Sequence, residues 1–181
     1  MGRCCGTHAV FGREKMPELV RHTLEPIYNK KSRILILGSM PSPKSRELGF
    51  YYANPQNRFW KILPELLLQP MPQTKNERTD FLLQNRIALW DVLKSCRIEG
   101  ADDSSIREAE PNDLSEILSS ADIRAVFTTG SKAYSLYRRL CQPHTNREAI
   151  PLPSTSPANC RHYTYRSLLD AYSAILPYLR E

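Results

Sequence analysis

Short apolar runs alternate with longer segments of helical period along the chain from residue 33 onward. Continuous runs of β-branched and aliphatic residues are typical of parallel strands that are buried on both faces. The sequence predicts such strands at residues 33–37, 87–91, 124–128 and 150–153. Apolar residues at helical spacing predict helices at residues 57–68, 76–84, 131–140 and 164–179. The prolines of the last strand place it at an edge of the sheet or end it early.

Strands that alternate with helices in this way favour an α/β fold, here a three-layer α/β/α sandwich around a short central parallel sheet of about four strands. We expect residues 1–181 to form a single domain, with residues 1–31 as a polar, irregular lead-in. Residues 99–112 are polar and acid-rich, and we expect a helix to begin after them with Asn112 as its N-cap. Such sheets bind ligands at the carboxyl ends of their strands, so the site is sought in the residues that follow each strand.

The composition is that of a compact globular chain, with 181 residues of which 41% are hydrophobic and 24% charged. A formal net charge of +6 favours an anionic partner such as nucleic acid. The five cysteines are odd in number and scattered, which predicts no disulfide framework, no bound metal and no iron–sulfur cluster. No apolar run is long enough to cross a membrane, and the N-terminus lacks an apolar secretory segment. We expect a cytoplasmic protein that acts as a monomer without a cofactor.

Polar segments follow each predicted strand, at residues 38–42, 91, 128–130 and 154–159. They hold hydroxyl, amide and carboxyl side chains but no Cys–His or Ser–His–Asp arrangement, which argues against covalent acyl chemistry. The chain also lacks the glycine-rich sequences that cradle nucleoside triphosphates or dinucleotides. These segments therefore form the candidate site, and no nucleophilic triad is indicated.

Five sequence motifs in a fixed order carry a resemblance to a known family. They are G-S-M-P-S at 38–42, Y-Y-A-N-P-Q-N-R-F-W at 51–60, A-L-W-D-V-L at 88–93, F-T-T-G-S-K-A at 127–133 and L-P-S-T-S-P-A-N at 152–159. This order resembles the uracil-DNA glycosylase superfamily, and most closely its hypoxanthine-DNA glycosylase branch. The resemblance implies an enzyme of DNA repair that flips a deaminated base out of damaged DNA and hydrolyses its N-glycosidic bond without a metal. Hypoxanthine is the first expected base and uracil the second, and the product is an abasic site.

The resemblance also implies roles for individual residues. Asn57 matches the candidate catalytic Asn, whose amide would orient water or contact the base, although an Asn there could equally cap a helix. Asp91 could be a pocket carboxylate that positions water, or a structural acid. Thr129 stands where the branch has an Asn, and its hydroxyl could still donate a hydrogen bond to the base. Met40 stands where many members of the superfamily have Asp or Asn, so no general base is expected at that position.

The remaining expected site residues fall into two groups. The base pocket is predicted at Gly38, Ser39, Met40, Pro41, Tyr51, Tyr52 and Thr128. We expect one of the two tyrosines to stack on the base and the other to pack into the core. Contacts to the DNA backbone are predicted at Ser42, Lys44, Arg58, Ser154, Thr155, Ser156, Pro157, Asn159 and Arg161. Two other readings stay open, a DNA- or nucleotide-binding domain that lost the chemistry and a small-molecule hydrolase.

Overall fold

A four-stranded parallel sheet forms the centre of the molecule. The computed structural model describes residues 17–180. The strands are β2 (Ile34–Gly38), β3 (Ile87–Asp91), β6 (Ala125–Thr129) and β7 (Ala149–Leu152), in the order β3-β2-β6-β7. Every residue of β2 and β6 is buried, as their continuous apolar sequences require, and the proline-containing β7 lies at an edge. The α/β fold and all four strands were therefore predicted correctly.

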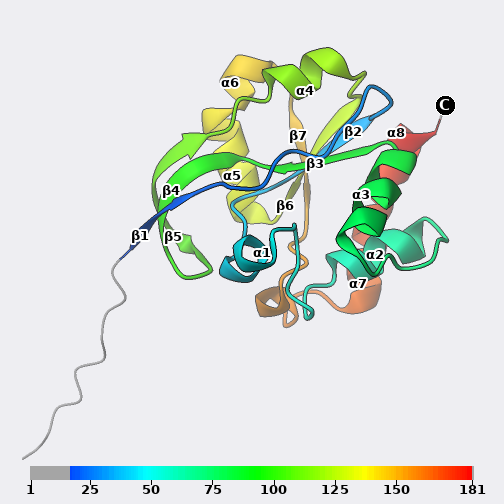
Figure 1. Cartoon of the computed structure of the whole chain (residues 1–181), viewed down its shortest axis with the longest axis horizontal. Helices are drawn as coiled ribbons and strands as arrows, with labels where there is room; N and C mark the ends of the chain where they lie inside the picture. Colours follow the sequence, from blue (N-terminus) through cyan, green and yellow to red (C-terminus); the bar gives the residue numbers. More distant parts are fainter. Residues whose placement is uncertain (1–16, 181) are drawn as a thin grey trace, which may run out of the picture.

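Helices cover both faces of this sheet, which gives three layers (Figure 1). The helices are α1 (Pro43–Leu48), α2 (Phe59–Leu66), α3 (Lys75–Gln84), α4 (Ser115–Ser120), α5 (Ser131–Leu140), α6 (Gln142–Thr145), α7 (Tyr165–Tyr172) and α8 (Leu176–Leu179). The predicted closing helix is broken between α7 and α8 by a 3₁₀ turn, Ser173–Ile175. Pro177 in the first turn of α8 has no amide hydrogen to continue the α-helical ladder across this break.

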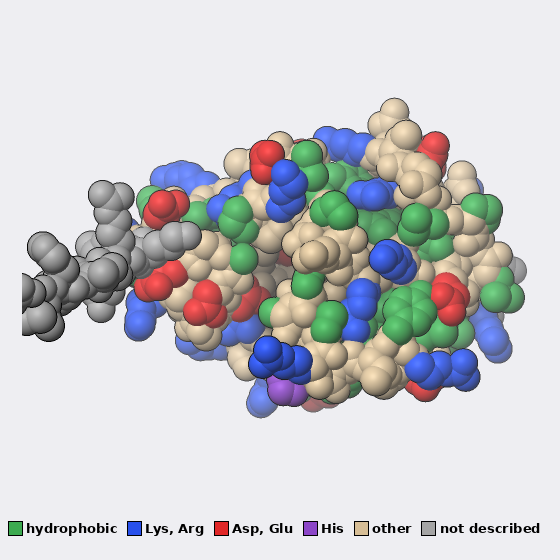
Figure 2. Space-filling view, turned by 90° about the horizontal axis from the view of Figure 1, so that it is seen from below, with side chains coloured by type: hydrophobic (Ala, Val, Ile, Leu, Met, Phe, Trp, Pro, Cys, Tyr) green, Lys and Arg blue, Asp and Glu red, His purple; other side chains and the backbone are tan. Residues whose placement is uncertain are grey.

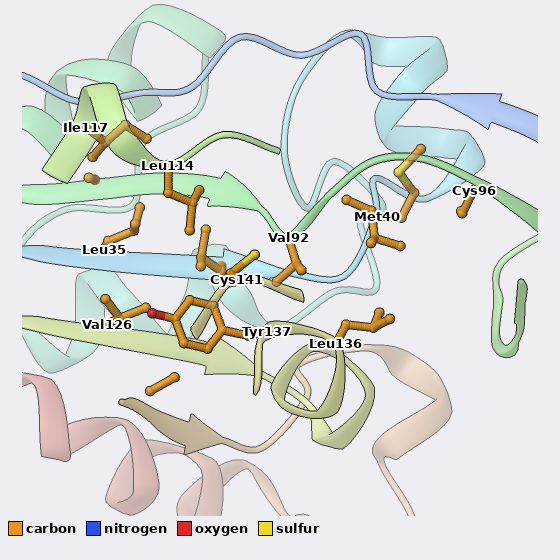
Figure 3. Close-up of a cluster of buried hydrophobic side chains, with 14 of the residues drawn as sticks. Leu35, Met40, Val92, Cys96, Leu114, Ile117, Val126, Leu136, Tyr137 and Cys141 are labelled. Atoms are coloured by element: carbon orange, nitrogen blue, oxygen red, sulfur yellow. The ribbon is translucent and has the colours of Figure 1, made fainter. Parts of the chain in front are cut away.

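Alternate residues of β2 point into two separate hydrophobic cores. Leu35 and Leu37 pack with residues of α4 and α5, whereas Ile34 and Ile36 pack with residues of α2, α3 and α7. Figure 3 shows the first core, in which Met40 lies close to Cys96 and the Tyr137 ring lies near Val126. None of the helices in residues 17–180 is both long and apolar enough to span a membrane.

A second, antiparallel sheet was not predicted. It consists of β1 (Glu18–Arg21), β4 (Leu93–Glu99) and β5 (Asp102–Pro111), with β4 in the middle. The expectation of an irregular lead-in is therefore wrong for residues 17–31, because β1 pairs with β4 and Ile27 forms a bridge to Leu89. Most of the acid-rich segment forms β5, in which half of the residues are exposed and only Ile106 is buried, so it lacks the apolar run that marks a buried strand.

Asn112 is not the N-cap that the sequence predicts. Helix α4 begins later, at Ser115. The side-chain amide of Asn112 instead donates hydrogen bonds to the backbone carbonyls of Asp91 (2.9 Å) and Leu93 (3.0 Å). Buried at the end of β5, Asn112 satisfies carbonyls where the chain passes from the parallel sheet into β4.

Candidate active site

A cavity of about 780 Å³ opens at the carboxyl ends of the central strands. Most of the predicted site residues line it: Gly38, Ser39, Met40, Pro41, Ser42, Tyr51, Tyr52, Asn57, Asp91, Thr129, Ser154, Thr155, Ser156 and Asn159. Figure 2 views the molecule from below α1, where polar side chains and backbone fill the middle of the face. Lys and Arg side chains lie around this face, and acidic side chains gather toward one end of it. The predicted site residues therefore lie at the carboxyl ends of the strands, where parallel sheets usually bind ligands.

The end of β2 and the end of β3 meet in the cavity with almost no space between them. Gly38 pairs with Asp91 across the two parallel strands. A methyl group on Gly38 would overlap the Oδ1 atom of Asp91 and would lie 3.2 Å from the hydroxyl of Tyr52. Only glycine allows the carboxylate and the tyrosine to occupy these positions together.

We expect Gly38→Ala to lower both stability and activity. The added methyl must displace the Asp91 carboxylate, and such overpacking costs about 1–3 kcal/mol. Urea unfolding measures this cost, and a DNA strand-cleavage assay measures the activity. In a Gly38→Ala/Asp91→Ala double mutant the clash is gone. The double mutant should therefore lose less unfolding free energy than the sum of the losses in the two single mutants. Strictly additive costs would show that the contact between these residues is not the cause.

Asp91 accepts a buried hydrogen bond from a residue that the sequence did not indicate, His22, whose Nδ1 accepts in turn from the backbone N–H of Leu24. Nε2 of His22 donates to Oδ2 of Asp91 at 2.8 Å, and both side chains are almost fully buried, with 3% and 6% exposure. His22 follows β1 directly, and its ring lies near those of Tyr51 and Trp90. This His22–Asp91 pair joins the antiparallel sheet to the end of β3, and it orients the carboxylate at the cavity.

Asn57 lines the cavity and caps the first backbone N–H of α2 with its side chain, although Arg58 occupies the N-cap position itself. Its side-chain Oδ1 accepts a hydrogen bond from the backbone N–H of Phe59 (3.0 Å), the first residue of α2. Its own N–H is held by the carbonyl of Asn54 at 2.8 Å. Among residues 17–180, no partner is present for its Nδ2 group, which therefore remains free to donate. The two readings of Asn57 are compatible, because the capping bond fixes the orientation of the amide.

Both tyrosines line the cavity and pack against the core, so which of them stacks on a base stays a prediction. Tyr51 is buried, and its hydroxyl donates to the carbonyls of Glu25 (2.8 Å) and Leu24 (3.2 Å). Tyr52 has a positive φ of 50° and stacks on Phe59 with ring centroids 4.0 Å apart. Its hydroxyl shares a hydrogen bond of 2.9 Å with that of Thr129. Burial raises the pKa of Tyr52 well above its usual range, so this hydroxyl stays protonated.

A second carboxyl group in the cavity, Asp103, was also missed by the sequence reading. It lies on β5, and its Oδ2 accepts a hydrogen bond of 2.6 Å from the hydroxyl of Ser39. Burial, followed by the nearby charge of Asp91, raises the pKa of Asp103 above its ordinary value, against the lowering effect of the Ser39 bond. No local pattern could reveal it, because only the antiparallel sheet brings β5 to the end of β2.

The loop after β7 forms another wall of the cavity. Ser154 accepts a hydrogen bond at Oγ from the N–H of Ser156 (3.2 Å) and one at its carbonyl from the side chain of Asn159 (2.9 Å). Gly130, with φ of +94°, lies close enough that a methyl group there would be 3.2 Å from the Ser154 Cβ. The loop is therefore held in shape by its own polar side chains and by its close approach to the end of β6.

Several predicted residues lie outside the cavity: Lys44, Arg58, Thr128, Pro157 and Arg161. Thr128 is fully buried, because side chains alternate along β6 and its neighbour Thr129 takes the cavity position. Arg58 is used internally, since its N–H donates to the carbonyl of Thr155 and its guanidinium to that of Tyr163. Thr128 therefore does not line the base pocket, and its predicted role there is wrong. The phosphate contact of Arg58 stays a prediction, since its Nε and Nη2 atoms have no hydrogen-bond partner within residues 17–180.

The other three residues lie at the surface near the cavity wall. Lys44 is exposed and forms an ion pair with Glu47 one turn along α1. Pro157 begins the short 3₁₀ turn that shapes the loop after β7. Arg161 is exposed just beyond this turn and has no ion-pair partner within residues 17–180. Of the three, Arg161 is the cation best placed to contact a DNA phosphate.

Known proteins resemble this chain in both sequence and structure. Residues 25–180 match the family model of the uracil DNA glycosylase superfamily. A protein of Methanosarcina acetivorans named hypoxanthine DNA glycosylase is 36% identical over 147 residues, 79% of this chain and 90% of the relative. A protein of the same name from Methanosarcina barkeri is 33% identical over 110 residues, 60% of this chain and 70% of the relative.

A solved structure shares the architecture. The solution NMR structure of a Methanosarcina acetivorans protein, described provisionally as a uracil DNA glycosylase, superposes with a TM-score of 0.76 at 30% identity. The match covers 91% of this chain and all of the other. The matched region includes the four strands that end at the cavity and every cavity-lining residue described above. This chain belongs to the uracil DNA glycosylase superfamily.

Proposed function

We propose that this protein is a DNA glycosylase that hydrolyses the N-glycosidic bond of a flipped hypoxanthine, with uracil as a second substrate, and leaves an abasic site. The observation that carries the proposal is the free amide of Asn57 in the same cavity as the Asp91 carboxylate and the Tyr52–Thr129 hydroxyl pair. A volume of about 780 Å³ lies within the usual range for small-ligand sites and can accept a flipped nucleoside. The names of the two Methanosarcina relatives support hypoxanthine as the first substrate.

Each group has a task in this reaction. The sugar becomes cationic as the bond breaks, and negative charge develops on the leaving base. The Nδ2 group of Asn57 would donate to the base or hold the attacking water, and the hydroxyls of Tyr52 and Thr129 would donate to base oxygens. The Asp91 carboxylate, oriented by His22, would align water and stabilise the cationic sugar. Met40 packs in the core and supplies no base, so this work falls to Asp91 and Asn57.

The test is an incubation of the protein with three labelled duplexes, which differ only in holding one deoxyinosine, deoxyuridine or deoxyadenosine at the same position. Alkali then cleaves any abasic site. We expect strand cleavage for deoxyinosine, less for deoxyuridine and none for deoxyadenosine. Duplex binding without cleavage of either lesion would favour a binding-only domain instead.

The basic surface predicts a salt-dependent DNA affinity. Arg161 is exposed beside the cavity wall, and we expect it to contact one backbone phosphate. Arg161→Ala should weaken binding of damaged and undamaged duplex alike and should reduce the slope of log K against log salt by about 1. Fluorescence anisotropy over a salt series measures this slope, with Arg166→Ala, an arginine ion-paired on α7, as the control. An unchanged slope would remove Arg161 from the DNA interface.

We propose that the enzyme acts as a monomer in the cytoplasm.

A further inference from the structure

Two carboxyl groups flank the end of β2 in very different surroundings. The Asp91 carboxylate, beside Gly38, is buried and accepts a hydrogen bond from the His22 ring. Asp103 lies on the other side, at Ser39, and its hydrogen bond comes from a neutral hydroxyl. Among residues 17–180 its Oδ1 has no partner, although the residue lines the cavity. Two carboxyl groups whose surroundings differ in this way commonly take the acid role and the base role of one reaction.

The charges around Asp103 favour a retained proton. Burial is the largest cause that raises its pKa, and the carboxylates of Asp91 and Asp102 raise it further. Lys132 at the start of α5 acts in the opposite direction, as does the Ser39 hydroxyl. The other titratable groups that interact with it are the Tyr52 phenol and the Cys96 thiol, the latter also near Arg46. The neighbours that raise the pKa of Asp103 are therefore its acidic ones, whereas the Asp91 carboxylate has a hydrogen-bond donor of its own in His22.

We propose that Asp103 is a catalytic acid that protonates the leaving purine, a role that rests on the proposed glycosylase function. The proton passes from Oδ1 of Asp103 to N7 of hypoxanthine while the C1′–N9 bond breaks and its electron pair stays with the base. The oxygen of a water molecule forms the new bond to C1′ and releases its proton to solvent. Asp103 then recovers a proton from solvent, so the net reaction is hydrolysis.

This role makes a distinction between the two substrates. A purine has a ring nitrogen, N7, that is remote from the glycosidic bond and can take a proton before the bond breaks. Uracil has no such imidazole nitrogen and leaves with its charge stabilised by hydrogen bonds alone. The Asp103 proton should therefore matter for hypoxanthine and much less for uracil.

The decisive variant is Asp103→Asn, which keeps an acceptor for the Ser39 hydroxyl but has no proton to give. We expect its single-turnover rate on a deoxyinosine duplex to fall about 100-fold, within the range usual for loss of a general acid. The rate on deoxyuridine should fall less than about tenfold by the same argument. In the wild-type enzyme the deoxyinosine rate should decline as pH rises through the pKa of Asp103, whereas the Asn variant should be slow and independent of pH over that range. Glu108→Gln removes one negative charge from the same hairpin, where Glu108 pairs with Arg97, and should leave both rates unchanged.

The outcomes separate the two claims. A raised pKa means that ionised Asp103 destabilises the fold, so Asp103→Asn should melt at the same or a higher temperature than wild type at neutral pH. A deoxyinosine defect in a stable variant then supports the acid role. If Asp103→Asn lost equal activity on both bases, or lost none on deoxyinosine, the acid role would be overturned. The proposed glycosylase function of the wild-type protein would still stand. A wild-type protein that cleaves neither duplex would instead overturn the proposed function itself, and the acid role with it.

Discussion

Asn57→Ala is expected to lower the rate of hypoxanthine excision by about 10²–10³-fold, the usual cost of removing one preorganised hydrogen-bond donor from an active site. The amide is held by its bond to the Phe59 N–H, so no reorganisation is needed when charge develops on the base or water. Single-turnover cleavage of the deoxyinosine duplex measures the rate. Duplex affinity should change little, because the side chain lies in the cavity and not on the basic surface.

Loss of the helix cap is the competing explanation for such a defect. Removing a cap costs about 0.5–2 kcal/mol of stability, which Asn57→Ala would also incur. Asn57→Asp keeps an oxygen for the Phe59 N–H, replaces the Nδ2 donor with an acceptor oxygen and adds a negative charge. We expect Asn57→Asp to fold as stably as wild type and to be as inactive as Asn57→Ala. An active Asp variant would show that Asn57 acts only as a cap.

His22→Ala is expected to destabilise the fold by at least about 1–3 kcal/mol, the usual cost of leaving a buried polar or charged group without its hydrogen bond. The Asp91 carboxylate would then lie buried without its partner, and β1 would lose its side-chain link to the end of β3. Urea unfolding followed by circular dichroism measures the change. Glycosylase activity should fall as well under conditions where the variant stays folded, because Asp91 is no longer oriented.

An exposed ion pair of the same molecule provides the control. Lys94 and Glu110 join β4 to β5 at 3.0 Å, but their side chains are 61% and 55% exposed. Lys94→Ala should therefore cost at most about 1 kcal/mol, as surface pairs do. The double mutant His22→Ala/Asp91→Ala should be more stable than the sum of the single changes predicts. A cost for His22→Ala no larger than that for Lys94→Ala would mean that the pair does not hold the two sheets together.

The central sheet could be predicted because burial leaves a strong mark on sequence. Strands covered on both faces must be continuously apolar, and residues 34–37 and 125–127 are. The antiparallel sheet could not be predicted in this way. Only one of the four residues of β1 and one residue of β5 are buried, so neither strand contains an apolar run. β1 is specified by its pairing with β4, a contact between segments far apart in the chain, whereas β4 and β5 pair as a local hairpin with register shifts.

The candidate site was predictable where it depends on strand ends and not where it depends on distant pairing. Gly38, Asp91 and Thr129 lie in the cavity because parallel strands end at one edge of the sheet. The prediction of Thr128 in the base pocket was wrong by one position, because neighbouring residues of a strand point to opposite faces of the sheet. His22 reaches Asp91, and Asp103 reaches the cavity at Ser39, through the antiparallel sheet, 69 and 64 positions from these partners. No local motif encodes such a contact.

The most direct test of the account is the identity of the released product. The deoxyinosine duplex is incubated with an excess of protein, and the small-molecule fraction is analysed by mass spectrometry while abasic sites are counted on the DNA. We predict free hypoxanthine in amounts equal to the abasic sites, with the DNA strand intact until alkali is added. Release of a nucleoside or nucleotide, a strand cut without alkali, or no product from a folded protein that binds the duplex would contradict it.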